Sequence, residues 1–147
     1  MTVYRRLQRL AACVLGALLF SAGCVSSPSS PTNSAAFSEV DLLIGTGATA
    51  VSGNTLTVSY TGWLYDASQP EDKGAVFDTS GATPFSFQLG SSQVIAGWDQ
   101  GLVGMRVGGV RRLVIPPSLA YGAVRHGTIP PQATLVFEIQ LASVSAS

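Results

Sequence analysis

The residues of this sequence that could form a ligand site are mainly aromatic. They are Tyr60, Phe77, Phe85, Phe87, Trp98, Tyr121 and Phe137. Ligand pockets are lined mainly by apolar and aromatic side chains, and a few polar groups orient what they bind. The tyrosine hydroxyls and the carboxylate of Asp78 are candidates for such polar groups. Two plainer interpretations stay open, because aromatic residues at strand spacing usually belong to the core and aspartate is common in turns.

Charge and metal-ligand counts exclude other kinds of site. The 147 residues include 8 Lys and Arg, 8 Asp and Glu, one histidine and two cysteines. A formal net charge of zero leaves no basic excess to neutralise phosphates, which argues against nucleic-acid binding. Two cysteines and one histidine cannot form the usual four-ligand zinc site. The single histidine, His126, falls in a loop, where a solvated side chain is commoner than a catalytic one. We therefore expect neither a metal nor a cofactor.

The elements that must position the aromatic residues are mostly strands. Several short segments alternate apolar residues with polar or β-branched ones, which is typical of half-buried strands. The predicted strands are 39–44, 55–61, 84–89, two strands within 105–115 around a Gly108–Gly109 turn, and 134–141. We expect Val40, Leu42 and Ile44 to share one face of the first strand, and Val136 to point outward from the last.

One segment has the period of a helix. The apolar residues at helical spacing between positions 91 and 102 are Val94, Ile95, Trp98 and Leu102. Ser91 or Ser92 could cap the start of this helix, and Gly101 or Gly104 could end it. A helix this short needs a sheet to cover its apolar stripe. The sequence therefore predicts an α+β domain, in which a curved antiparallel β-sheet wraps around one short α-helix.

The first 23 residues have the pattern of a secretion signal. Arg5, Arg6 and Arg9 precede an uncharged apolar run of 11 residues, Leu10–Phe20. A membrane-spanning helix needs about 20 apolar residues, so this run fits a cleaved signal peptide instead. The small residues before Cys24 resemble the lipobox of bacterial lipoproteins, which predicts lipidation of Cys24; the alternative is an ordinary cleavage site. We expect a protein secreted across the inner membrane and held at a membrane by this lipid, facing the periplasm or the cell exterior.

Residues 24–36 are rich in serine and proline, which predicts a tether between the anchor and a folded domain at 37–147. Removal of residues 1–23 takes away three arginines and no acidic residue. The mature chain then has five basic and eight acidic side chains, a formal charge of −3. Removal also takes away Cys13, so at most one cysteine is left and no intramolecular disulfide can form.

Five motifs follow one another through the predicted domain. They are Val58–Leu64 (VSYTGWL), Val76–Ser80 (VFDTS), Pro84–Gly90 (PFSFQLG), Gln93–Met105 (QVIAGWDQGLVGM), and the pair Ile115–Gly122 and Ile129–Phe137. In this order and spacing they closely resemble the FKBP-type peptidyl-prolyl cis-trans isomerases over Ser38–Leu141. The resemblance implies the fold of that family and its activity, which is rotation about the peptide bond that precedes proline.

The resemblance also implies roles at the matching positions. Tyr60, Asp78 and Tyr121 would form the catalytic group. The Tyr121 hydroxyl would donate to the substrate carbonyl, and Asp78 would lie within hydrogen-bond reach of Tyr60. The residues expected to bind substrate are Phe77, Phe85, Phe87, Val94, Ile95, Trp98, Ile129 and Phe137. Among these, Trp98 would form the pocket floor, and the backbone N–H of Ile95 would receive a ligand carbonyl.

The implied chemistry needs no nucleophile, metal or general base. Amide resonance sets a barrier of about 18–20 kcal/mol to rotation about a peptide bond. An apolar, water-poor pocket favours the twisted amide, which is less polar than the planar one.

The resemblance implies proline-containing polypeptides and macrolide inhibitors as partners. Because the sequence marks no oligomer interface, we expect a monomer. The alternative function is a client-binding or chaperone module that uses the same pocket without turnover.

Three loops differ from the common pattern of the family. The segment Asp66–Gly74 is longer and more polar than a short turn, which predicts an exposed bulge. No arginine lies between Asp78 and Pro84, where some members place one that pairs with the aspartate. The loop Tyr121–Ile129, which carries His126 and would overhang the pocket, is slightly short.

Overall fold

The structure is a computed structural model that describes residues 33–146. Its strands are β1 (Ser38–Leu43), β2 (Thr55–Tyr65), β3 (Lys73–Thr79), β4 (Phe85–Gln88), β5 (Val110–Ile115) and β6 (Leu135–Ser145), and its α-helix is α1 (Ala96–Gly101). Two 3-10 turns lie at Pro70–Asp72 (η1) and Pro117–Leu119 (η2). The predicted signal peptide, the predicted lipidation site Cys24 and most of the predicted tether lie outside the described residues.

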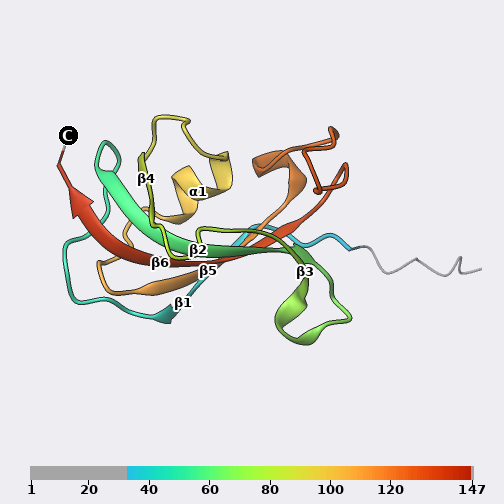
Figure 1. Cartoon of the computed structure of the whole chain (residues 1–147), viewed down its shortest axis with the longest axis horizontal. Coiled ribbons are helices and arrows are strands. Elements are labelled where there is room, and N and C mark those ends of the chain that lie inside the picture. The colour runs from blue at the N-terminus through green and yellow to red at the C-terminus, as the bar shows by residue number, and fades with distance from the viewer. Residues whose placement is uncertain (1–32, 147) are drawn as a thin grey trace, which may run out of the picture.

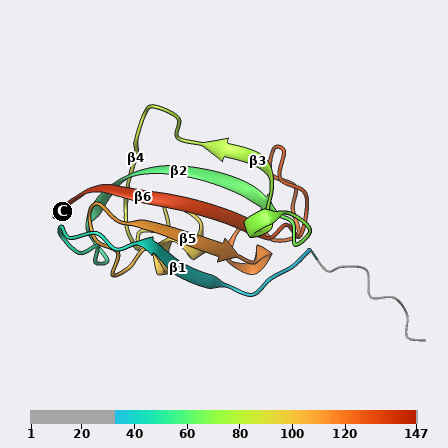
Figure 2. The same cartoon turned by 90° about the horizontal axis from the view of Figure 1, so that it is seen from below.

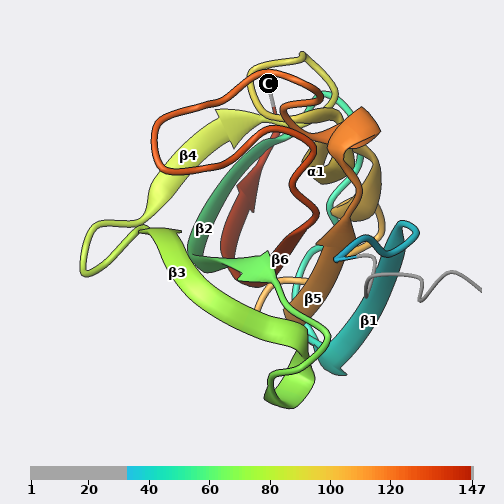
Figure 3. The same cartoon turned by 90° about the vertical axis from the view of Figure 1, so that its right-hand side faces the viewer.

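The strands pair antiparallel in one sheet with the order β1-β5-β6-β2-β3, and β4 also pairs with β2 (Figure 1). Figure 2 shows β2, β6, β5 and β1 side by side across this sheet. Figure 3 shows that the sheet curves and that α1 lies on its concave side. The predicted α+β architecture, a curved antiparallel sheet around one short helix, is confirmed.

The central strands β2 and β6 form the inner wall of the core. Val58 on β2 pairs with Leu141 on β6, and both side chains are fully buried. The next inward position on β2 is Tyr60, which pairs with Ile139 and is only partly buried. The inward face of β2 therefore has apolar core residues in its first half and presents a tyrosine to the concave surface at its middle.

Helix α1 lies close against β5 because glycines face that strand. A Cβ atom on Gly97 would lie 2.8 Å from Cδ1 of Ile115, and one on Gly101 would lie 2.8 Å from Cδ2 of Leu113. Real Cβ atoms do not approach other heavy atoms this closely, so only glycine permits this helix-to-strand distance. The close approach buries Trp98 to 4% exposure on the face of α1 that meets the sheet.

The helix is shorter than predicted. It begins at Ala96, with Ile95 in the N-cap position and no side-chain cap. Neither Ser91 nor Ser92 caps it, because Ser91 Oγ donates to the carbonyl of Gln88 (2.7 Å) and Ser92 has a φ of 58°, outside the helical region. Residues 91–95 are therefore a loop, and it carries part of the functional site.

The predicted hairpin within residues 105–115 is wrong in its first half. Only Val110–Ile115 forms a strand. The backbone of Met105 instead accepts the N–H of Ala50 (2.8 Å), and the N–H of Val107 donates to Ala48 (3.0 Å). The chain before the two glycines thus pairs with the loop that follows β1, and Gly108 turns it into β5 with a φ of 88°.

β1 is an edge strand and all its residues are exposed; Val40 and Leu42 are 54% and 46% exposed, and Ile44, 74% exposed, lies just beyond its end. One expectation about strand faces needs correction. Val136, predicted to point outward, is fully buried. It lies on the central strand β6, where its register neighbours Val114 and Trp63 share its face of the sheet and cover it from both sides.

Two sets of ion pairs tie the sheet together. The guanidinium of Arg111 donates to both carboxylate oxygens of Asp41 on β1 (2.7 and 3.1 Å) and to the carbonyls of Gly101 (2.9 Å) and Val103 (3.1 Å). It thereby joins the edge strand to the end of α1.

Among residues 33–146, no helix is long and apolar enough to cross a membrane.

The second set, called here the ion-pair cluster, lies across η1, β3, β5 and β6. Lys73 Nζ lies 2.7 Å from a carboxylate oxygen of Glu71 and of Glu138. Arg112 lies 2.9 Å from Glu71 and 2.8 Å from Glu138. The cluster holds η1, which lies within the predicted bulge at Asp66–Gly74, against the sheet.

Candidate active site

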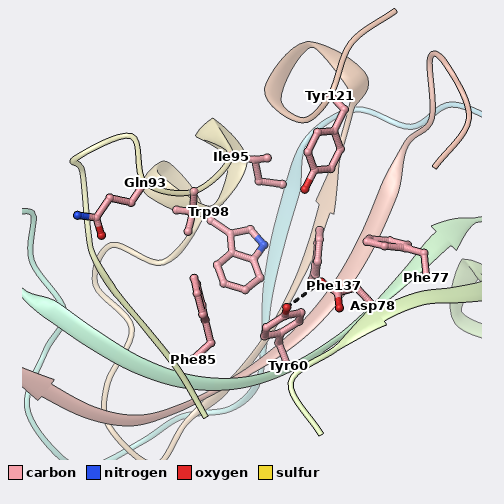
Figure 4. Close-up of a pocket in the computed structure, with 10 residues that line it drawn as sticks. Tyr60, Phe77, Asp78, Phe85, Gln93, Ile95, Trp98, Tyr121 and Phe137 are labelled. Carbon is pink, nitrogen blue, oxygen red and sulfur yellow. Dashed lines mark hydrogen bonds between the residues drawn. The ribbon is translucent and has the colours of Figure 1, made fainter. Parts of the chain in front are cut away.

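A pocket opens on the concave side of the sheet, between the middle of β2, the end of β3, the start of β6 and the start of α1 (Figure 4). Its volume is about 190 Å³. Its lining residues are Tyr60, Phe77, Asp78, Phe85, Gln93, Val94, Ile95, Trp98, Tyr121 and Phe137. The structure therefore gathers the three residues predicted to be catalytic and six of the eight predicted to bind substrate.

The floor of the pocket is the indole of Trp98, held on its sides by other aromatic rings. The ring of Tyr60 lies edge-on to it with centroids 5.0 Å apart, and Phe137 does the same at 5.3 Å. Phe87 packs against the indole at 5.6 Å. The buried indole N–H finds no hydrogen-bond acceptor within residues 33–146. Perpendicular aromatic contacts of this kind favour one ring orientation, so the floor is preformed.

Gly62 allows two of the wall aromatics to close over β2. A Cβ atom at this position would lie 2.8 Å from Phe137 Cε1 and 2.8 Å from Phe77 Cζ. The rings of Phe77 and Phe137 meet edge to face with centroids 5.5 Å apart. Gly62 lies in one of the five motifs but had no predicted role, because a close approach of rings to a backbone becomes visible only in the folded chain.

Tyr60 and Asp78 form the polar part of the wall. The Tyr60 hydroxyl donates to Asp78 Oδ2 over 2.7 Å, and the N–H of Thr79 donates to Asp78 Oδ1 over 2.8 Å. These two donors orient the carboxylate in a segment that has no arginine. Burial, followed by the hydrogen bond and charge of Asp78, raises the pKa of Tyr60 from 10.0 to about 12.

Tyr121 follows η2 and directs its hydroxyl into the pocket from the side opposite Tyr60 (Figure 4). Its ring stacks on His126 with centroids 4.4 Å apart and planes 9° from parallel. The hydroxyl makes no hydrogen bond within the part of the chain that the structure describes, so it is free to donate to a ligand. Burial, and then the charge of Asp78, raises the pKa of Tyr121 above its ordinary value.

Two residues predicted to bind substrate lie behind the pocket surface. Phe87 is 3% exposed and supports Trp98 from below, and Ile129 is 5% exposed in the core. Ile129 closes the loop above Tyr121, because its N–H and carbonyl each bond to the backbone of His126 (2.9 and 3.1 Å). Phe85 lies at the rim, 41% exposed.

Gln93 lines the pocket and was not predicted to do so. Its side-chain Oε1 accepts the backbone N–H of Gln88 over 2.9 Å, which fixes the chain where β4 ends. Nothing in the sequence distinguishes this glutamine from an exposed helical residue. Within residues 33–146, no group of three or more histidine, cysteine, aspartate or glutamate side chains could hold a metal ion.

Comparison with known proteins agrees with this geometry. The family model for FKBP-type peptidyl-prolyl cis-trans isomerase matches residues 47–142. The chain is 47% identical over 107 residues to an FK506-binding protein of Neisseria meningitidis, which covers 71% of this chain and 92% of that protein. It is 46% identical over 106 residues to FK506-binding protein 4 of Dictyostelium discoideum, covering 70% of this chain and 27% of that one.

Among solved structures, FkpA from Escherichia coli superposes with a TM-score of 0.65 and 38% identity, over 75% of this chain and 48% of that one. The chain thus spans about a quarter of the Dictyostelium protein and about half of FkpA, but nearly all of the Neisseria protein. The family model covers more than half of the chain, and the relatives share its sequence and its fold. The chain therefore belongs to the FKBP-type peptidyl-prolyl cis-trans isomerase family.

Proposed function

We propose that this protein accelerates cis–trans isomerisation of X–Pro bonds in extracytoplasmic polypeptides. The observation that carries the proposal is the pocket itself, which has an indole floor, aromatic walls and a few polar groups. Such a site suits a proline ring flanked by peptide groups. The family to which the chain belongs supports the same activity.

The mechanism follows from the electronic change in the amide. Rotation out of the plane breaks the resonance that gives the bond its barrier of about 18–20 kcal/mol. The twisted amide carries less charge on its carbonyl and loses less by leaving water, so a dry aromatic pocket stabilises it relative to the planar substrate. The Tyr121 hydroxyl donates to the substrate carbonyl and the Ile95 N–H binds a neighbouring one. With both tyrosines protonated near neutral pH, neither is a base, and the bond rotates without a covalent intermediate.

The cellular setting is part of the proposal. Support comes from the sequence alone: the arginines before Leu10–Phe20, the small residues before Cys24, and the Ser/Pro-rich tether. We propose a lipid-anchored monomer whose domain faces the periplasm or cell exterior, with proline-containing polypeptides as substrates. The name FK506-binding protein, carried by its relatives, makes FK506-type macrolides candidate competitors for the pocket.

The test is an isomerisation assay with the full-length protein in detergent and a tetrapeptide that contains one Leu–Pro bond. We expect the cis-to-trans rate to rise in proportion to protein concentration and to fall when FK506 is added. The client-binding alternative predicts that the protein suppresses aggregation of an unfolded polypeptide but leaves the isomerisation rate unchanged. That second pattern would reject the enzymatic proposal.

A further inference from the structure

The loop that joins β4 to α1 supplies three neighbouring residues of the pocket lining, Gln93, Val94 and Ile95. Its backbone is unusual for a pocket wall. Gly90 has a φ of 80° and Ser92 a φ of 58°, and the left-handed region is unfavourable for serine. The N–H of Ile95 donates to no group within residues 33–146, which leaves it available to a ligand. A loop of this kind needs a support that keeps its donor in place.

The support is the carboxylate of Asp99, the fourth residue of α1. Asp99 Oδ1 accepts the N–H of Gly90 over 2.8 Å, and Oδ2 accepts the N–H of Ser92 over 3.0 Å. Both oxygens of one ionised group are therefore used by the backbone of one loop. Hydrogen bonds to an ionised acceptor are about twice as strong as neutral ones. The two bonds bracket the start of the loop and hold Ser92 in its unfavourable conformation.

Asp99 itself has a fixed position. It follows Trp98, the pocket floor, and its own N–H donates to the carbonyl of Ile95 over 3.3 Å. The N–H of Trp98 donates to the same carbonyl over 2.9 Å. The carbonyl of Ile95 is thus hydrogen-bonded to α1, which carries the pocket floor. The preceding residues Gly90 and Ser92 are hydrogen-bonded to Asp99. The distance between the floor and the free Ile95 N–H is set by this arrangement.

We propose that Asp99 is a positioning residue for polypeptide binding, which acts by holding the loop 90–95 so that the Ile95 N–H meets a backbone carbonyl of the substrate. Asp99 does not line the pocket, so its effect on a bound polypeptide passes through the loop. The inference rests on the proposed function and adds the residue that sets the geometry of its binding donor. Because this donor binds the planar and the twisted substrate alike, its loss raises KM and spares kcat.

The test compares wild-type protein with Asp99→Asn, using an Ala-Leu-Pro-Phe peptide as substrate. An asparagine keeps the size of the side chain, but it can accept only one of the two N–H groups and points an NH2 group at the other. We expect KM to rise about ten-fold, the size of one lost hydrogen bond, with kcat within about two-fold of wild type. The matched control is Gln100→Ala, an exposed neighbour on α1 outside the pocket, for which both constants should stay at wild-type values.

A purely structural role would give a different pattern, because partial unfolding lowers the active fraction and hence the apparent kcat at an unchanged KM. An unchanged KM in folded Asp99→Asn, with or without a fall in kcat, overturns the proposal. If the wild type proves not to be an isomerase, the dissociation constant of the same peptide is compared instead of KM. A failure of the isomerase proposal can therefore be told apart from a failure of the Asp99 proposal. If the variant does not fold, amide exchange in the wild type decides: saturating peptide should slow exchange at Gly90 and Ser92, and unchanged exchange overturns the proposal.

Discussion

The two tyrosines of the pocket keep their protons for the same two reasons. Burial is the larger cause of the raised pKa of both Tyr60 and Tyr121, and the negative charge of Asp78 adds to it. Their hydroxyls are therefore neutral donors at any pH below about 10. A neutral phenol can orient a carbonyl by a hydrogen bond, and it does not attack the bond or remove a proton from it.

Tyr121→Phe removes only the hydroxyl that points into the pocket. The phenylalanine ring can still stack on His126, so the loop above the pocket should keep its shape. One hydrogen bond to the substrate is worth about 1–2 kcal/mol, which corresponds to a five- to thirty-fold fall in kcat/KM. The measurement is peptide isomerisation, with Tyr65→Phe, a β2 tyrosine outside the pocket lining, as control. Complete loss of activity in a folded variant would point to acid–base or covalent chemistry.

Asp78→Asn tests how the carboxylate controls its neighbour. The asparagine oxygen can still accept the Tyr60 hydroxyl, but the charge that disfavours phenolate is gone. We expect the pKa of Tyr60 to fall below about 12 and to stay above 10, because burial is the larger cause. Since the folded pKa exceeds the unfolded value of 10.0, Tyr60 stabilises the fold fully below pH 10 and less as pH rises toward 12. NMR titration of the Tyr60 ring carbons measures this pKa in the wild type and in the variant. A pKa that stays at about 12 in Asp78→Asn would contradict the role of the Asp78 charge.

Motif spacing was enough to predict most of the pocket, because each aromatic residue is tied to a recognisable neighbour in the chain. Phe77 beside Asp78 and Trp98 after Gly97 are examples. It did not distinguish pocket surface from buried support: Phe85 and Phe87 share one face of β4 and their rings stack, yet Phe87 is buried against Trp98 and Phe85 is exposed at the rim. That difference depends on what packs across the sheet, and a linear pattern does not contain it.

At the level of elements, the ion-pair cluster fastens η1 to β5 and β6. Hydrogen bonds from Lys73 and then Arg112 lower the pKa of Glu71 to about 2. Burial alone would raise the pKa of Glu138, but hydrogen bonds from the same two cations bring it below its ordinary value. Both carboxylates therefore bind protons more weakly in the folded chain than in the unfolded one.

This sign fixes the pH window of the effect. Groups with depressed folded pKa values stabilise the fold above their unfolded pKa, here 4.5, and the stabilisation is lost as pH falls toward 2. We expect the urea concentration at the unfolding midpoint of the wild type to decrease as the pH is lowered from 5 to 3. In Glu71→Gln this decrease should be smaller. Asp72→Asn is the control. It also changes an acid to an amide, but at a neighbouring side chain that forms no ion pair within the described residues. An identical pH dependence in wild type and Glu71→Gln would show that Glu71 contributes nothing to this decrease.

The inward faces of β2 and β6 were predicted, but both strands run four residues past their predicted ends, to Tyr65 and Ser145, and β3 was not predicted. The period of β2 is clear because the core covers one side of it. The segment before Gly108 has the residues of a strand, but it pairs with the loop after β1, a partner that no local pattern indicates. The start of α1 was misplaced for a related reason: the residues that begin the loop are held by Asp99, which lies further along the chain.

For the whole molecule, the attachment to a membrane is the part that the sequence predicts and residues 33–146 do not include. Cys24→Ser should remove the lipid attachment site, so that the protein moves from the membrane fraction to the soluble fraction of cells that make it. Several acyl chains are needed for stable attachment, since a single one gives only marginal binding. Isomerase activity of the released protein should equal that of the wild type, because Cys24 precedes the domain. Unchanged membrane fractionation of Cys24→Ser would reject the lipoprotein assignment.

The place of β6 in the sheet has a consequence for how the domain is made. β6 is the last strand along the chain, yet it lies between β5 and β2 at the centre of the sheet, and it brings Phe137 to the pocket. While a ribosome synthesises the chain, the earlier strands have an incomplete core, because β5 and β2 have no partner between them. Pairing between segments so distant in sequence is slow to form. We therefore expect the nascent domain to stay unfolded, and accessible to proteases and chaperones, until Ser145 has emerged.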